Sequence, residues 1–217
     1  FFYNLNLTIP ELAKELNLSI PTVTKLVNEM VEDGILNDYG KSDSGDSRAG
    51  RKPSTYGLNP HSGYFLGIDI KRNHVNIGLC NFNGDIVRQD FDIQFTESIP
   101  MDDINEICQI TNSFIKSSGI DKSKILNTCV NISGRVNPST GFSYSMFNFS
   151  ETPITDIFSE KLGIPVCIEN DTRSMTYGEC LKGSTVSGEK NILYVNLGWG
   201  LGLGIVINGT VYEGKSG

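Results

Sequence analysis

The sequence lacks long apolar runs and paired cysteines. No apolar stretch approaches the roughly 18 residues of a membrane-spanning helix, and no signal segment is visible. We therefore expect a cytoplasmic protein with no membrane partner. The cysteines are odd in number and scattered, and none forms a C-x-x-C pair. We interpret them as free thiols in a reducing compartment, outside any disulfide framework or zinc site: Cys80, Cys108, Cys129, Cys167 and Cys180.

Positive charge is also scarce. Lys and Arg total 18 against 25 Asp and Glu, which gives a formal net charge of −7. Residues 1–60 hold six basic and eight acidic side chains, a net charge of −2. Total charge therefore gives no support to nucleic-acid binding. Three of those six cations fall within residues 48–52. If the chain binds DNA, the attraction must come from such a local patch of positive charge and from dimerisation.

The first 60 residues nevertheless predict a helix-turn-helix. Thr8 and Glu11 have the spacing of a capping box, and Ser19 is placed to cap a second helix that runs to about residue 33. Two such helices joined by a short turn form a helix-turn-helix unit. At helical spacing, we expect these apolar side chains to face inward: Leu12, Ala13, Leu16, Ile20, Val23, Leu26, Val27 and Met30.

The outward face of the second helix has the side chains that a recognition helix needs. Short polar and cationic groups near its N-terminus can reach phosphates and base edges in the major groove. The alternative is a helical hairpin that only packs on another domain. We expect DNA contacts from Ser19, Pro21, Thr22, Lys25 and Asn28.

A wing is predicted after the second helix. Two short apolar strands, at residues 35–36 and 55–58, flank a polar loop. A glycine between cations lets the backbone approach DNA, and Arg and Lys suit the narrow minor groove. The alternative is a solvated basic loop. We expect DNA contacts from Arg48, Gly50, Arg51 and Lys52.

Residues 61–217 predict a second, mixed α/β domain, with the boundary at Asn59-Pro60. Three strands precede a β-α-β alternation, which is typical of such a domain. We expect strands at residues 64–70, 75–80, 86–93, 125–132, 166–168, 192–197 and 203–207, and helices at residues 102–117, 153–162 and 171–181.

Three segments of this domain are candidates for ligand binding. Asn170-Asp171 stands at a strand-to-helix junction, where open α/β folds bind ligands, although Asp171 could merely cap the helix. Every second residue of the segment 198–204 is glycine. Such a segment lets the backbone approach a phosphate, or it forms an ordinary hairpin without a ligand. The first hairpin has Asp69 but no glycine after it, and we interpret it as an ordinary turn. Lys71, Arg72 and Asn73 there would block a backbone approach to phosphate, or at best replace it by side-chain contacts.

These motifs, in this order, resemble the ROK family of repressors, reading frames and sugar kinases. The wing Gly50-Arg51-Lys52-Pro53 is similar to the Gly-Arg-Pro wing of the repressor branch, with one residue inserted. Further matches are the Gly67–Ile70 strand, the stretch from Ser133 to Gly141, Glu169-Asn170-Asp171, the glycine motif from Leu197 to Gly204, and Asn208 to Gly214. The resemblance implies a winged helix-turn-helix followed by the first lobe of an actin-like ATPase fold.

The resemblance also implies site residues. Asn170 and Asp171, with Gly134, would hold a sugar, and the matching Asp is the catalytic base in kinase members. Kinase members have Asp-x-Gly-Gly-Thr where this chain has residues 69–73, and Trp199 replaces a small hydroxyl residue. We therefore expect no ATP cofactor and no catalytic residue. The family's Glu-x-Gly-His motif and zinc site would lie beyond Gly217, and its first DNA-binding helix mostly before Phe1, so we expect a fragment.

The sequence thus predicts a sugar-responsive repressor that binds operator DNA as a homodimer or higher homo-oligomer, with a sugar or sugar phosphate as effector. The enzyme alternative is an ATP-dependent sugar kinase with a DNA-binding head, in which Asp171 would act. A third alternative is a DNA-binding protein whose sugar cleft is vestigial and whose signal is a protein partner.

Overall fold

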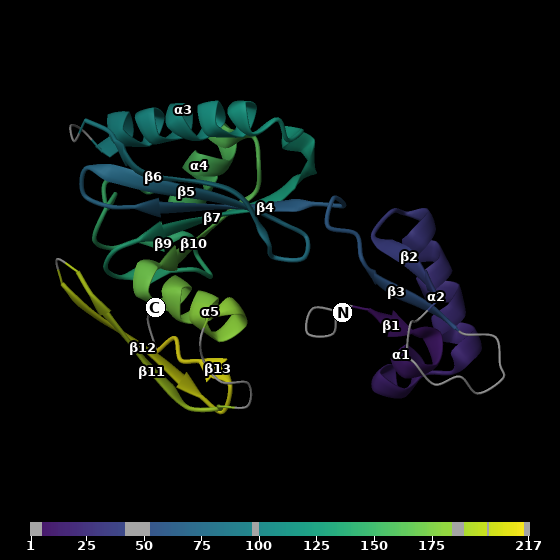
Figure 1. Ribbon diagram of the computed structural model, residues 1–217. Helices are drawn as coiled ribbons and strands as arrows, with labels where there is room; N and C mark the ends of the chain where they lie inside the picture. Colours follow the sequence, from purple (N-terminus) through teal and green to yellow (C-terminus); the bar gives the residue numbers. More distant parts are fainter. Residues whose placement is uncertain (1–5, 42–52, 97–99, 184–188, 199, 215–217) are drawn as a thin grey trace. The chain divides into compact units, whose positions relative to one another are not determined.

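The computed structural model describes residues 6–41, 53–96, 100–183, 189–198 and 200–214 (Figure 1). The chain divides into two compact units. The first unit comprises residues 1–64 with 80–86, and the second comprises residues 65–79 with 87–217. Within the described ranges, no helix is both long and apolar enough to cross a bilayer.

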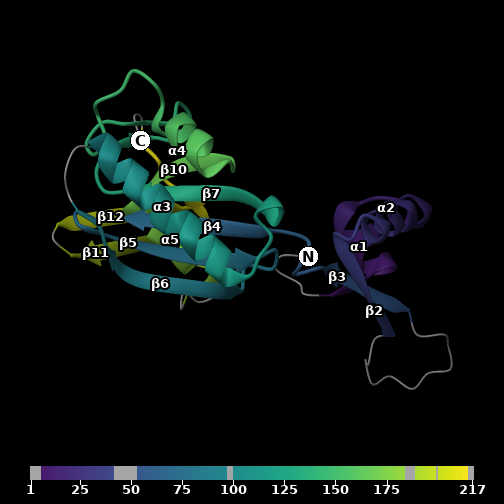
Figure 2. The same ribbon diagram turned by 90° about the horizontal axis from the view of Figure 1, so that it is seen from above.

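The first unit is a winged helix-turn-helix. Its elements are β1 (Leu7–Thr8), α1 (Ile9–Leu16), α2 (Ile20–Glu32), β2 (Leu36–Lys41) and β3 (Ser54–Leu58). The three strands form one sheet in the order β1-β3-β2. In Figure 2 the strands β2 and β3 extend away from the helices as a hairpin, whose connecting residues 42–52 lie outside the described ranges.

Local hydrogen bonds fix the ends of both helices. The amide of Thr8 donates to Glu11 Oε2 at 2.8 Å, and Thr8 Oγ1 accepts from the Glu11 amide at 3.4 Å, so the predicted capping box is confirmed. Ser19 caps α2 by accepting from the Thr22 amide at 3.3 Å. Between the helices Asn17 turns the chain with φ of +53°, a conformation that Asn tolerates better than most residues.

The core of the first unit is narrower than the sequence predicted. Leu12, Ala13, Val23, Val27 and Leu36 are buried, and Met30 packs partly against them. Leu16, Ile20 and Leu26 were expected to face inward, but they are 55%, 54% and 43% exposed. The prediction was wrong for these three because the short helices meet along one strip. Leu26 lies about 100° around α2 from Val27, and the other two lie at the helix ends.

The second unit is built on a five-stranded sheet in the order β10-β7-β4-β5-β6. Three strands of this sheet follow one another along the chain and are joined by short connections: β4 (Tyr64–Ile70), β5 (His74–Asn81) and β6 (Ile86–Gln94). The other two, β7 (Ile125–Ile132) and β10 (Val166–Asn170), run parallel to each other. The predicted strands and helices of this domain are confirmed, and most bounds agree within two residues.

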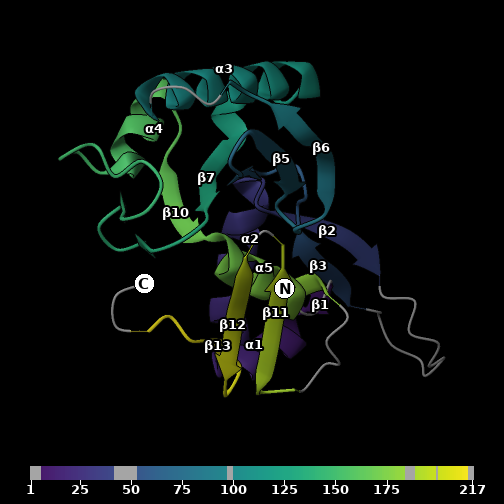
Figure 3. The same cartoon turned by 90° about the vertical axis from the view of Figure 1, so that its left-hand side faces the viewer.

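Helices cover the two faces of this sheet differently. The long α3 (Pro100–Ser118) and α4 (Ile154–Leu162) lie on one face (Figure 3). Ile68, Ile77 and Val130 are among the buried residues of the sheet. The other face carries α5 (Asp171–Lys182), which packs between this sheet and a second one (Figure 1). That second sheet has the order β11-β12-β13. The remaining elements are η1 (Lys122–Lys124), β8 (Val136–Asn137), β9 (Phe142–Ser143), β11 (Ile192–Leu197), β12 (Leu201–Ile207) and β13 (Thr210–Val211).

The glycines of β12 serve helix packing. A Cβ atom at Gly202 would lie 2.1 Å from Thr172 Oγ1, and one at Gly204 would lie 1.8 Å from Thr176 Oγ1. Both threonines belong to α5, so these two glycines let the helix approach the strand closely. Pairing of Leu201 with Leu197 of β11 starts β12 two residues earlier than the sequence predicted.

Candidate functional site

The N-terminal half of α2 presents an exposed polar face. The predicted residues Ser19, Pro21, Thr22, Lys25 and Asn28 are mostly solvent-accessible. Lys25 is 78% exposed and forms only a loose ion pair with Glu29, at 3.8 Å. Such an exposed pair contributes little to stability and leaves the ammonium available to another anion.

The hydroxyl of Ser19 is already engaged. Besides accepting from the Thr22 amide, Ser19 Oγ lies 2.7 Å from Thr22 Oγ1. The two hydroxyls therefore support the helix start together. The four wing residues predicted to contact DNA lie outside the described residues: Arg48, Gly50, Arg51 and Lys52.

The second unit contains a polar cleft of about 890 Å³. It lies where β7 and β10 end, at their carboxyl edge, which is where open α/β sheets bind ligands. All three residues predicted to bind sugar line it: Gly134, Asn170 and Asp171. The turn after β4 contributes Lys71, Arg72 and Asn73, and the glycine segment contributes Gly198, Gly200 and Gly202.

Asp171 is held by groups from three segments. Its Oδ2 atom accepts from Ser133 Oγ at 2.6 Å and lies 3.4 Å from Lys71 Nζ. Its Oδ1 atom accepts from the Thr172 amide at 2.8 Å. Lys71 Nζ also lies 2.9 Å from Asp69 Oδ1, so one ammonium neutralises part of the charge of two carboxylates.

The environment of Asp171 favours the charged carboxylate. Burial by itself raises the pKa of Asp171, but the Ser133 hydrogen bond, the Lys71 charge and the Thr172 amide together outweigh it. The net effect holds the pKa of Asp171 below its usual value. The carboxylate is therefore a hydrogen-bond acceptor at neutral pH, and a weaker base than an ordinary Asp.

Asn170, and not Asp171, caps α5. Its Oδ1 atom accepts from the Arg173 amide at 3.0 Å, and its Nδ2 group donates to the Gly134 carbonyl at 2.9 Å. Gly134 has φ of +92°, and a Cβ atom there would lie 2.6 Å from Ser145 Oγ. Gly134 thus fits a site that excludes any side chain, and its carbonyl orients Asn170.

A buried ion pair supports the same helix start. Arg173 Nε donates to Glu169 Oε1 at 2.7 Å, and their side chains are only 8% and 13% exposed. Glu169 Oε1 also accepts from the Asn170 amide at 2.6 Å. Arg173 further donates to the Glu213 carbonyl at 3.2 Å, which ties α5 to the segment after β13.

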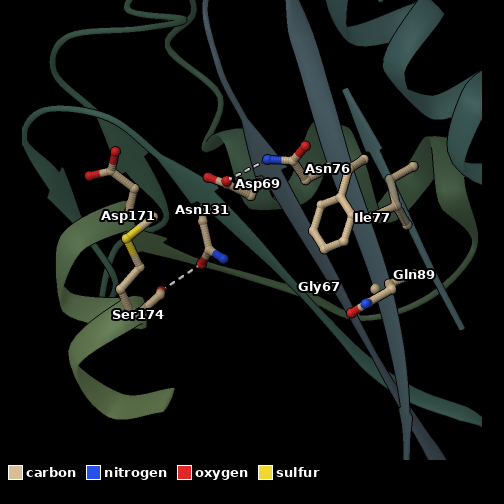
Figure 4. Close-up of a pocket in the computed structure, with 11 residues that line it drawn as sticks. Gly67, Asp69, Asn76, Ile77, Gln89, Asn131, Asp171 and Ser174 are labelled. Carbon is tan, nitrogen blue, oxygen red and sulfur yellow. Dashed lines mark hydrogen bonds between the residues drawn. The ribbon is translucent and has the colours of Figure 1, made fainter. Parts of the chain in front are cut away.

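A smaller pocket of about 290 Å³ adjoins the cleft and shares Asp171 and Met175 with it (Figure 4). Its polar walls are ordered by hydrogen bonds within the protein. Asn76 Nδ2 donates to Asp69 Oδ2 at 3.1 Å, and Ser174 Oγ donates to Asn131 Oδ1 at 2.6 Å. In the described parts of the chain, no group of three or more His, Cys, Asp or Glu is placed to hold a metal ion.

A family model described as the ROK family matches residues 65–217. The chain belongs to the ROK family. A second model, described as winged helix-turn-helix DNA-binding, matches residues 5–37. The chain therefore joins an N-terminal winged helix-turn-helix to a ROK part, which is the fold that the sequence predicted. The ROK part is matched over residues 65–217.

Two curated relatives are xylose repressors. That of Bacillus subtilis (strain 168) is 26% identical over 209 residues, which cover 95% of this chain and 53% of that protein. That of Staphylococcus xylosus is 27% identical over 222 residues, covering 100% of this chain and 55% of that protein. The chain thus spans about half the length of these relatives.

One solved structure shares both parts of the chain. A crystal structure described as a ROK family transcriptional regulator, a homolog of the E. coli MLC protein, aligns with a TM-score of 0.74 at 22% identity. The alignment covers 97% of this chain and 53% of that one. It supports the fold, a winged helix-turn-helix followed by a ROK lobe.

Sequence reasoning missed two groups of the ROK cleft. Ser133 was named only as the start of a family motif, and Lys71 was expected to block phosphate or at best to contact it through its side chain, whereas both contact Asp171. A signal for Ser133 was present, because it follows the buried strand β7 just as Asn170-Asp171 ends β10. The carboxyl ends of adjacent parallel strands meet, so side chains there come together.

Proposed function

We propose that this chain is part of a transcriptional repressor that binds operator DNA through its winged helix-turn-helix and responds to a sugar bound in its ROK part. The observation that carries the proposal is the presence, in one chain, of an exposed polar helix face and a separate polar cleft. The xylose repressors, which match along nearly the whole chain, have names that agree with this pairing.

On the DNA side, α2 acts as the recognition helix. Thr22, Lys25 and Asn28 recur at helical spacing on its exposed face, so they can enter the major groove together. The wing adds Arg48, Gly50, Arg51 and Lys52 at the minor groove. Because the chain has more acidic than basic residues, its attraction to DNA phosphates depends on these few cations. A homodimer bound to a two-fold symmetric operator would present twice as many of them.

On the effector side, the cleft offers hydrogen-bond acceptors and donors for sugar hydroxyls. Asp171 supplies a charged acceptor, and Asn170 and Ser133 stand beside it. Arg72 and Arg135 also line the cleft, so a phosphorylated sugar is accommodated as well as a neutral one. The sugar shifts DNA affinity only if it binds one geometry of the repressor better than another.

The proposal makes the chain a cytoplasmic binding protein and not an enzyme. A phosphate-binding turn needs small residues, so that backbone amides approach the phosphate. Here the turn after β4 carries Lys71, Arg72 and Asn73, and the Lys71 ammonium fills the space beside Asp171. These residues do not fit ATP, and the lowered pKa of Asp171 does not favour a base.

The DNA half is tested by titrating the intact protein onto its own upstream DNA at two salt concentrations. Lys25→Ala and Arg51→Ala should each weaken binding, and the salt slope should fall by about 0.9 for each phosphate that is no longer neutralised. Lys116→Ala, an exposed lysine of α3, is the matched control and should change neither. Unchanged binding in both DNA-face variants would place the DNA face elsewhere.

The effector half is tested by calorimetry with pentoses, hexoses and their phosphates, beginning with xylose. Heat that Asp171→Asn abolishes supports a sugar cleft at this position. No heat with any sugar favours the vestigial-cleft alternative with a protein partner. If the protein instead transfers phosphate from labelled ATP to a sugar, and the Asp171→Asn variant does not, the sugar-kinase alternative is established.

A further inference from the structure

Two thiols that are far apart in the sequence meet on the five-stranded sheet. Cys129 of β7 and Cys167 of β10 are Cα partners in the parallel register of these strands. Residues paired in register point to the same face, and adjacent strands lie about 4.8 Å apart. That spacing falls within the Cα separation of about 4.4–6.8 Å at which disulfides form. The Cα separation therefore permits a disulfide.

The side chains lie on the same face of the sheet. Cys129 Sγ donates to Asn131 Oδ1 at 3.4 Å, and Cys167 Sγ donates to Asn127 Oδ1, on the strand of Cys129, at 3.5 Å. The interaction between the two thiols is the main cause of the altered acidity of both. It lowers the pKa of Cys167 to about 7, against an opposing effect of burial, and raises the pKa of Cys129. Cys167 is exposed and Cys129 is half-buried. The pair thus combines an accessible, partly ionised attacking thiol with a shielded partner behind it.

Two other cysteines differ from this pair. Cys108 is buried, and burial raises its pKa to about 11, so it is a poor nucleophile. Cys180 is exposed like Cys167, but it lies on helix α5 and not on the strand pair. Cys180 therefore serves as a control, because it is exposed like Cys167 but is not paired in register with a second cysteine.

We propose that Cys129 and Cys167 form a reversible dithiol–disulfide site that reacts with a low-molecular-weight disulfide such as oxidised glutathione. The Cys167 thiolate attacks one sulfur of oxidised glutathione, forms a mixed disulfide and releases one glutathione thiolate. The Cys129 thiol then loses its proton to solvent, and its sulfur attacks the Cys167 sulfur and releases the second glutathione. In sum, the two protein thiols are oxidised to a disulfide and oxidised glutathione is reduced to two thiols.

This site adjoins the smaller pocket through one amide. Cys129 Sγ donates to Asn131 Oδ1 at 3.4 Å, and the same oxygen accepts from Ser174 Oγ at 2.6 Å. Oxidation removes the Cys129 hydrogen and with it one of the two donors to Asn131. The disulfide also fixes β10 to β7 three residues before Asn170.

The test treats the intact protein with oxidised glutathione at neutral pH, then alkylates the remaining thiols and maps them by mass spectrometry. We expect a peptide pair joined through Cys129 and Cys167, reversed by dithiothreitol. The Cys129→Ser variant should instead accumulate a stable glutathione adduct on Cys167. The Cys180→Ser variant should behave like the parent, and unchanged melting temperatures will show that each variant is folded.

Three outcomes would overturn the proposal. One is a lasting glutathione adduct on Cys167 in the parent protein, which would mean that Cys129 cannot resolve it. Another is a disulfide between copies of the chain. The third is modification of Cys180 as fast as Cys167, because the neighbouring Cys129 thiol would then give Cys167 no advantage.

Discussion

Lys71 Nζ lies 3.4 Å from Asp171 Oδ2, although the two residues are 100 positions apart. The interaction joins the turn after β4 to the start of α5. Their side chains are only 24% and 12% exposed, so solvent screens the pair weakly. A ligand that reaches Asp171 must therefore share the carboxylate with Lys71 or displace it.

Replacing Lys71 should destabilise the ROK part and raise the pKa of Asp171. Lys71→Met removes the charge that offsets Asp69 and Asp171, so we expect a loss of about 1–3 kcal/mol in the free energy of unfolding at neutral pH. Chemical denaturation measures this loss. Lys116→Met, on the exposed side of α3, should change stability by less than about 0.5 kcal/mol. Equal effects would mean that the ion pair contributes nothing.

The lowered pKa of Asp171 fixes the sign of its pH dependence. A carboxyl whose folded pKa is depressed contributes stability that is present above its unfolded pKa of about 3.9 and is lost as pH falls through the folded value. Asp171 should therefore stay charged throughout the neutral pH range. In Lys71→Met its carbon resonance should titrate at higher pH than in the parent. No shift between the two proteins would contradict the electrostatic interaction.

Gly134 should not tolerate a side chain. Gly134→Ala places a Cβ atom against Ser145 and keeps φ at +92°, so we expect a loss of about 1–3 kcal/mol in stability. The substitution should also displace the Gly134 carbonyl, which accepts a hydrogen bond from Asn170. Gly178→Ala is the matched control, because nothing lies within 4 Å of that position in α5 and Ala favours a helix. Thermal denaturation of both variants separates steric conflict from a general effect of alanine.

The buried Glu169–Arg173 pair should matter far more than the exposed Lys25–Glu29 pair. Arg173→Met leaves Glu169 buried and unpaired, which we expect to cost about 3–5 kcal/mol. Adding Glu169→Gln should recover part of that loss. Lys25→Met, in the exposed pair, should change stability by less than about 0.5 kcal/mol. A double-mutant cycle on each pair measures the difference, and similar coupling energies would contradict it.

Sequence patterns predicted the elements well because their signals are local. Thr8 with Glu11, and Ser19 before Pro21, identify helix starts from hydrogen bonds between residues close in sequence. The wrong predictions concern Leu16, Ile20 and Leu26, whose burial depends on what the helices meet and not on their periodicity. The first wing strand was also predicted too short, at residues 35–36, because pairing with β3 continues through polar residues to the end of β2 (Leu36–Lys41). Packing partners of short helices cannot be deduced from helical spacing alone.

For the candidate site too, the sequence identified local features but not the contacts between distant segments. Asn170-Asp171 could be placed because a strand-to-helix junction is visible in the sequence. The interactions of Lys71 and Ser133 with Asp171, and the meeting of Cys129 with Cys167, depend on which strands become neighbours. Strand order is a long-range property, so the sequence indicated the residue types but not their pairing.

The most direct test of the central claim is a titration of the intact protein onto its upstream DNA, with and without each sugar, at two salt concentrations. The account predicts tight, salt-sensitive binding whose affinity one sugar shifts, and a loss of that shift in Asp171→Asn with DNA binding retained. Weak, sequence-blind binding that no sugar changes would contradict it.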